Sequence, residues 1–197
     1  NQPYQYWEYS IFVAEVASTT NEALLNDYLL KEIDDEQKRI YLLNHYLEGF
    51  RGTVFRQTMF AEFEHLIHKM AQDGVALTAE SLTQTYYDLN KKYFGEDIVI
   101  DEEIGLEWSR IPHFYYNYYV YQYATGFSAA AALSSQILEE GQPAVERYLG
   151  FLEAGSSDFP IEVLKKAGVD MTSPEPIKAA CKVFEEKLTE LEQLLDI

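Results

Sequence analysis

Cysteine is almost absent from the 197-residue sequence, which contains only Cys181. A single cysteine cannot form an internal disulfide, so the sequence lacks the covalent framework of small secreted domains and is typical of a reducing, cytoplasmic compartment. Because Cys181 falls within a helical pattern, we expect it to be a packing residue rather than a nucleophile.

Basic residues are also scarce: 15 Lys and Arg stand against 33 Asp and Glu, which gives a formal net charge of −18. An acidic surface repels phosphate backbones and anionic lipid headgroups, so we expect neither a nucleic acid nor a membrane surface as a partner. No apolar run approaches the roughly 20 residues of a membrane span. The N-terminus has no signal-peptide features and no initiator Met, so we expect the chain to be part of a longer, soluble protein.

Apolar residues, by contrast, are plentiful at 47% of the sequence, and they recur mostly with the period of an α-helix. The pattern predicts an all-α fold, a multi-helix bundle in one domain spanning residues 1–197. Gly49 and Gly52 are expected to bend or break the second helix, and 98–100 is the one short β-like run. The expected helices cover residues 10–33, 36–72, 78–93, 115–140, 143–153, 161–166 and 174–196.

Glu15 interrupts a run of apolar and small residues at positions 12–18. Glu8, Glu15 and Glu22 are seven residues apart, so they are expected near one helix face. Three interpretations remain open for Glu15: a solvated acidic stripe, a metal ligand, or the partner of a buried cation, since an unpaired buried carboxylate is costly.

Glu62 and His65 form a Glu-x-x-His pair, a spacing that recurs in di-iron helical bundles. Such a site needs two copies, and no other histidine has a glutamate three residues before it. We therefore expect His65 and His68 to be polar groups of the surface or core.

Tyrosines are densest between Pro112 and Gly126, directly after His113. A core does not need so many phenols, since each buried hydroxyl requires a partner. In a continuous helix Tyr115, Tyr119 and Tyr123 would form one row, with Tyr118 and Tyr121 on a neighbouring row. Two interpretations remain open: a stacked aromatic core, or His and Tyr donors that stabilise a developing oxyanion.

The sequence contains no His-Glu-x-x-His zinc motif, no Cys-x-x-Cys pair and no Gly-rich phosphate loop. We therefore expect that the chain on its own does not carry a complete catalytic site.

Three segments together resemble the C-terminal part of the oligoendopeptidase F family of zinc metallopeptidases, which is related to thimet oligopeptidase. They are YSIFVAEVAST at 9–19, FAEFE at 60–64, and IPHFYYN at 111–117 with the following Tyr-rich run to Gly126. The resemblance covers essentially the whole chain and implies a mostly helical catalytic domain around a peptide channel.

The resemblance also implies roles for particular residues. Glu15 matches the family's glutamate zinc ligand, and Glu22 matches a second acidic position that would support the metal shell. His113 matches the substrate-binding histidine, while Tyr118 is the first and Tyr121 the second choice for the substrate-binding tyrosine. In the family, His-Glu-x-x-His lies just upstream of the position of Asn1, so this chain is expected to lack two zinc ligands and the general base.

The implied function is hydrolysis of short peptides by the full-length protein, with this chain alone inactive. Its implied partners are short peptide substrates and the N-terminal part of the peptidase. The alternative is a non-enzymatic helical interaction module, whose exposed apolar faces pair with a second copy of the chain or with the remainder of the protein.

Overall fold

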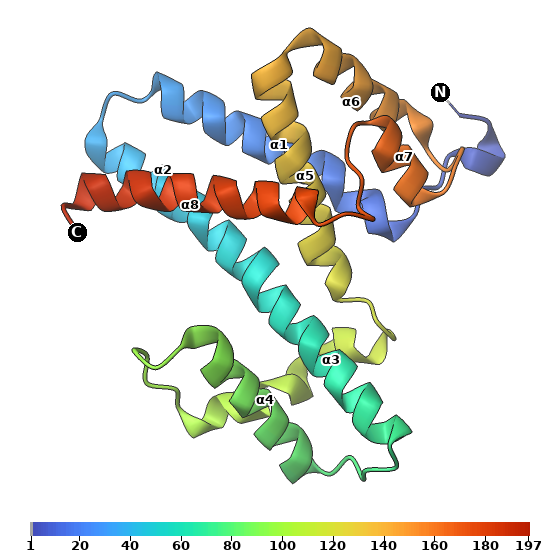
Figure 1. Cartoon of the computed structure of the whole chain (residues 1–197), viewed down its shortest axis with the longest axis vertical. Coiled ribbons are helices and arrows are strands. Elements are labelled where there is room, and N and C mark those ends of the chain that lie inside the picture. The colour runs from blue at the N-terminus through green and yellow to red at the C-terminus, as the bar shows by residue number, and fades with distance from the viewer. Residues whose placement is uncertain (1) are drawn as a thin grey trace. The chain divides into compact units, whose positions relative to one another are not determined.

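The computed structural model describes residues 2–197, and no β-strand occurs among them. The all-α prediction is confirmed, and the run 98–100 is irregular rather than extended in a sheet. Figure 1 shows the helices, whose bounds are α1 Ile11–Glu32, α2 Glu36–Phe50, α3 Arg56–Gln72, α4 Ala79–Phe94, α5 Tyr121–Glu140, α6 Gln142–Ala154, α7 Pro160–Lys166 and α8 Glu175–Leu195.

Capping residues explain where several of these helices begin and end. The Ser10 hydroxyl accepts from the Phe12 N–H at the start of α1. At α4, Thr78 and Ser81 form a reciprocal capping box, so two backbone donors that the helix leaves free are satisfied. Gly95 ends α4 at a φ of 77°, in the left-handed region that favours glycine.

Two helix boundaries differ from the prediction. Residues 36–72 contain α2 and α3 joined by a π-helical segment, η2, at Arg51–Phe55. The expected distortion therefore includes Gly52, whereas Gly49 lies within α2. Residues 115–120 are not α-helical. The 3-10 helices η3 (Glu102–Arg110) and η4 (Pro112–Tyr115) precede them, and α5 begins only at Tyr121.

The chain divides into two compact units, one formed by the residues up to Val54 with Thr125–Ile197, the other by Phe55–Ala124. We call them the terminal unit and the inserted unit. That all these residues form one domain stays a prediction.

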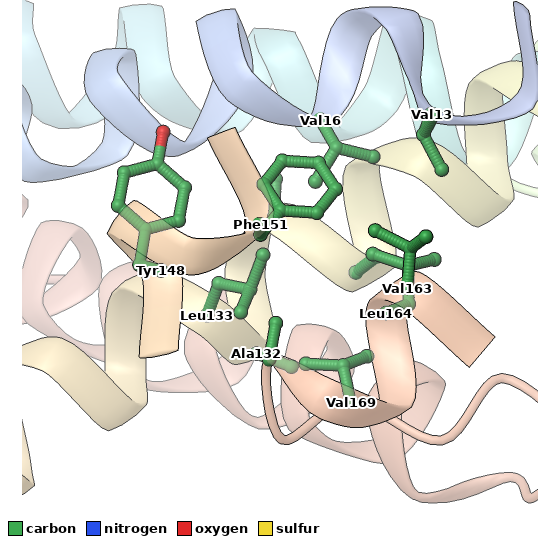
Figure 2. Packing of buried hydrophobic residues seen from close by; sticks show 12 residues of the cluster. Val13, Val16, Ala132, Leu133, Tyr148, Phe151, Val163, Leu164 and Val169 are labelled. Atoms are coloured by element: carbon green, nitrogen blue, oxygen red, sulfur yellow. The ribbon is translucent and has the colours of Figure 1, made fainter. Parts of the chain in front are cut away.

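The terminal unit is built around a buried apolar cluster drawn from α1, α5, α6 and α7 (Figure 2). Val16 on α1, Leu133 on α5 and Phe151 on α6 belong to it. The α5 helix contributes mainly small residues, and Ala129–Ala132 are all buried, which allows close packing of helices. Elsewhere in this unit α2 packs against both α8 and α1. Cys181, on α8, is exposed, so its predicted packing role is wrong.

The inserted unit consists of α3, α4, η3, η4 and the residues that follow up to Ala124. Phe63 on α3 and Tyr86 on α4 are fully buried and meet edge to face at 5.1 Å. Phe114 packs on the same cluster, 5.1 Å from Phe63. No helix among the described residues combines the length and apolarity needed to cross a membrane.

Candidate functional site

The tyrosine-rich segment of the inserted unit is held by apolar residues at both ends. Ile111 and Val120 are buried at 6% and 1% exposure, and both belong to the core of this unit. Pro112 opens η4, and the preceding Ile111 is extended, as a residue before proline prefers. The side chains between these anchors are mostly exposed, including Tyr115, Tyr116 and Tyr118. The segment therefore lies at the surface of the inserted unit, with both of its ends anchored in the core.

His113 lies among three tyrosine rings of this segment. Its imidazole stacks on Tyr119 with 5.6 Å between ring centroids, and it meets Tyr116 and Tyr123 nearly at right angles at 5.9 Å and 6.0 Å. Tyr119 also packs edge-on against Tyr123. These contacts restrict the rotation of the half-buried His113 ring. A donor held in this way keeps its direction, which is what an oxyanion contact needs.

Tyr118 lies outside this group of rings. Its ring is 4.4 Å from that of His68 on α3, and its backbone N–H donates to the Glu64 carboxylate at 2.6 Å. Asn117 and Tyr118 both have positive φ, 51° and 61°, a conformation that ends the 3-10 turn before α5 begins. The expected helical row of Tyr115, Tyr119 and Tyr123 is therefore wrong, although Tyr119 and Tyr123 do pack together.

Tyr121, the second predicted tyrosine, is the first residue of α5 and is 43% exposed. The inserted unit thus contains His113, Tyr118 and Tyr121 on one short stretch of chain, and all three side chains are at least partly accessible. The rings packed on His113 are those of Tyr116, Tyr119 and Tyr123. The sequence predicted the last two as members of a helical row, but not as partners of the imidazole.

Glu15 and Glu22 are exposed side chains of α1 in the terminal unit. The Glu15 carboxylate accepts from the Ser18 hydroxyl at 3.1 Å. Glu15 is solvated in this chain, and its interpretations as a metal ligand or as the partner of a buried cation stay predictions. Glu8 precedes α1, so it does not continue a helical stripe with the other two glutamates.

Glu22 lines a cavity of about 360 Å³ between α1, α2 and α5 of the terminal unit. Apolar side chains such as Leu29 and Phe127 form most of its wall, and Tyr46 borders it. Burial, assisted by the charge of Asp27, raises the pKa of Tyr46 to about 12, so its hydroxyl stays protonated at neutral pH.

Metal-ligating side chains do not gather at one place in residues 2–197. The part of the chain that the structure describes contains no group of three His, Cys, Asp or Glu side chains arranged to hold an ion. Zinc in catalytic sites is held by three protein ligands.

A charged cluster around the buried Glu107 of the inserted unit was not predicted from the sequence. Glu107, on η3, accepts from Tyr86 at 2.7 Å, from Arg56 at 2.6 Å, and from Arg110. Burial by itself raises the pKa of the Glu107 carboxyl, but the Tyr86 hydroxyl and the two guanidinium groups outweigh it and hold the pKa below its usual value. Only Glu107 and Arg110, three residues apart, form a local pair that the sequence could have shown.

Comparison with known proteins places this arrangement in a family. The sequence profile of Peptidase family M3 matches residues 1–183, so the chain belongs to peptidase family M3.

Three relatives illustrate the similarity. The chain is 77% identical to oligopeptidase PepF of Bacillus subtilis and 56% identical to group B oligopeptidase PepB of Streptococcus agalactiae, with 99% of this chain matched in both. It is 58% identical in sequence to oligoendopeptidase-F from Enterococcus faecium. The crystal structure of that protein matches 95% of this chain with a TM-score of 0.91.

The matched relatives are much longer than this chain. The chain spans 29% of PepF, 32% of PepB and 36% of the Enterococcus faecium structure. The resemblance to oligoendopeptidase F is therefore confirmed for a segment of such a protein.

Proposed function

We propose that this chain is the C-terminal portion of a zinc-dependent oligopeptidase that hydrolyses short peptides. The observation that carries the proposal is the fixed segment 111–121, which presents His113 and two tyrosines on the surface of the inserted unit. Membership of peptidase family M3 and the names of the relatives support the reaction class.

In this proposal Glu15 supplies one oxygen ligand to the metal, and Glu22 supports the ligand shell. The two histidine ligands and the general base come from the remainder of the protein. The bound metal would lower the pKa of a water molecule so that hydroxide forms near neutral pH. An exposed carboxylate on a long helix, with a hydroxyl donor beside it, is consistent with a ligand that docks onto another part of the protein.

His113, Tyr118 and Tyr121 bind the peptide substrate. An imidazole N–H and a phenol O–H both donate, so they can hold the carbonyl oxygen of the scissile bond and the negative charge that develops on it. The tyrosine rings stacked on His113 keep the imidazole in one orientation.

The metal role is tested by measuring zinc content in the full-length protein. Glu15→Ala should lower the zinc content sharply, whereas Glu22→Ala should have a smaller effect, since loss of a supporting group costs about 10- to 100-fold in affinity. Glu8→Ala is the matched control, because Glu8 is an exposed glutamate that precedes the helix. Equal zinc content in Glu15→Ala and wild type would show that Glu15 is not a metal ligand.

The substrate role is tested by kinetics of the same full-length protein. His113→Ala and Tyr118→Phe should leave zinc content unchanged and lower kcat, by about 100-fold for one lost oxyanion donor. Tyr121→Phe should be the next most damaging change. If all three variants keep kcat within about twofold of wild type, the activation free energy has changed by well under 1 kcal/mol. The segment then does not stabilise the oxyanion.

An interaction module is the second candidate, and exposed aromatic side chains of the terminal unit favour it. Tyr4, Trp7, Tyr28 and Tyr41 are 86%, 57%, 57% and 69% exposed. Such a surface fits either the remainder of the peptidase or a second copy of this chain. A His-Glu-x-x-His motif upstream of Asn1 in the parent reading frame supports the peptidase, and its absence supports the module. The acidic surface and the single cysteine support a cytoplasmic protein that binds neither nucleic acid nor membrane.

A further inference from the structure

Glu64 is a buried carboxylate on α3 of the inserted unit, with 1% of its surface exposed. It lies next in sequence to Phe63, which is also fully buried. A carboxylate in such a place is costly unless donors satisfy it. The backbone N–H of Tyr118, 54 residues further along the chain, is such a donor at 2.6 Å. This distance is at the short end of the range for an N–H···O hydrogen bond.

The backbone that this bond holds is strained. Asn117 and Tyr118 follow one another with φ of 51° and 61°. Asn tolerates the left-handed region, but placing a bulky residue such as Tyr in it costs on the order of 1–2 kcal/mol. Such a conformation persists only where the surroundings over-determine it. The Glu64 bond acts at the strained residue itself.

His68 supplies the second contact to Tyr118. It lies four residues after Glu64, so the two side chains lie on the same face of α3. The His68 and Tyr118 rings are 4.4 Å apart, with their planes inclined by 32°. One face of α3 therefore contacts Tyr118 twice, at its backbone N–H and at its ring.

From this geometry we propose that Glu64 and His68 are positioning residues, which hold the strained turn at Tyr118 so that its phenol is presented to the peptide substrate. This inference rests on the proposed function, because it assigns the positioning of the tyrosine named there. Neither residue touches the substrate in this scheme. Glu64 fixes the backbone of Tyr118, and His68 limits the directions open to its ring.

Hydrogen exchange in the full-length protein tests the positioning without reference to catalysis. In Glu64→Leu, which keeps a similar volume and removes the acceptor, amide exchange in 116–120 should speed up by about tenfold, the effect of losing a buried hydrogen bond. Glu64→Gln keeps a carbonyl acceptor and should stay within about threefold of wild type. Glu62→Leu is the matched control. It lies on the same helix but bonds to Lys92 and Tyr93 instead, so it should leave exchange in this segment unchanged. Unchanged exchange in Glu64→Leu would overturn the proposal.

A double-mutant cycle tests the catalytic consequence. Glu64→Leu should lower kcat by about tenfold with little change in zinc content, since small misplacements of a reacting group are costly. In a Tyr118→Phe background the same change should have less than about a twofold effect, because the hydroxyl that it misplaces is already gone. If the fold losses in kcat of the two single variants simply multiply in the double variant, Glu64 does not act through the Tyr118 hydroxyl. That result would overturn the positioning role.

The outcomes separate this inference from the proposed function. If Tyr118→Phe retains wild-type kcat, the tyrosine role in the proposed function fails, and hydrogen exchange alone decides whether Glu64 holds the turn. If Tyr118→Phe loses activity but Glu64→Leu does not, the proposed function stands and the positioning inference fails. For His68, the ring-preserving His68→Phe should restore the kcat that His68→Ala loses.

Discussion

Replacing Glu107 should destabilise the inserted unit by an amount that can be worked out from its three partners. The Tyr86 hydroxyl is fully buried and bonds to Glu107, so Glu107→Leu leaves it without an acceptor. An unsatisfied buried hydroxyl costs about 1–3 kcal/mol. Arg56 and Arg110 have side chains that are 35% and 71% exposed, so water can replace the carboxylate at both. We therefore expect a loss of about 3 kcal/mol for Glu107→Leu and about 1.5 kcal/mol for Glu107→Gln, whose amide oxygen still accepts from Tyr86.

The same carboxylate predicts a pH dependence with a definite sign. The pKa of Glu107 in the folded unit lies below its ordinary value of 4.5. A group with a lowered pKa contributes stability above its unfolded pKa, and that stability is lost as the pH falls through the folded pKa. The difference in unfolding free energy between wild type and Glu107→Gln should therefore be largest at neutral pH and decrease as the pH falls below about 4.5.

The assay is urea unfolding of the 197-residue chain followed by the fluorescence of Trp108. Trp108 lies on η3 and packs on the core of the inserted unit, while Trp7 is 57% exposed and belongs to the terminal unit. A Trp7→Phe background therefore makes the signal report on the inserted unit alone. Glu102→Gln, an exposed carboxylate of the same η3 helix, is the control and should change stability by less than about 0.5 kcal/mol. Equal urea midpoints for wild type and Glu107→Leu would refute the reasoning, as would a wild-type to Glu107→Gln difference that does not change between neutral and acid pH.

Three further predictions follow from the chain itself. If the proposed function is right, the 197-residue chain should not hydrolyse a quenched peptide with or without added zinc, because Glu15 would be only one of the three protein ligands that catalytic zinc needs; turnover that a chelator abolishes would contradict this. Phe63→Ala should destabilise the inserted unit by about 3–5 kcal/mol, since a fully buried ring leaves a cavity; a loss under about 1 kcal/mol in the Trp108 assay would show that the core refills the space. Thr78→Ala should cost about 0.5–2 kcal/mol by removing the α4 capping box, whereas Thr78→Ser should be close to neutral in the same assay.

Local signals made most helices predictable. Ser10 and Thr78 mark the starts of α1 and α4 because their hydroxyls cap backbone donors only a few residues away. Gly95 marks the end of α4 for an equally local reason, its positive φ. In each case the interaction that fixes the boundary lies within one turn of the residue, so the sequence contains all of it.

The site segment could not be predicted in the same way, because the contacts that shape it are distant in sequence. Tyrosines at i and i+4 favour a helix, yet residues 115–120 turn instead, since Tyr118 donates to Glu64, 54 residues away. Glu107 similarly meets Arg56 and Tyr86, which are 51 and 21 residues away. Residue types identified His113 and the tyrosines as candidates, but only the fold decides which rings meet the imidazole.

The conformation of Tyr118 itself argues that its side chain does more than complete a turn. Glycine would occupy a φ of 61° at no steric cost, whereas a tyrosine there costs on the order of 1–2 kcal/mol. Packing does not explain the choice, because the Tyr118 side chain is 41% exposed and so gives up much of the apolar burial that a ring could gain. The fold also commits the buried Glu64 carboxylate to the backbone of this residue. A strained, exposed aromatic residue whose N–H donates to a buried acceptor supports the proposed role of the Tyr118 phenol in binding.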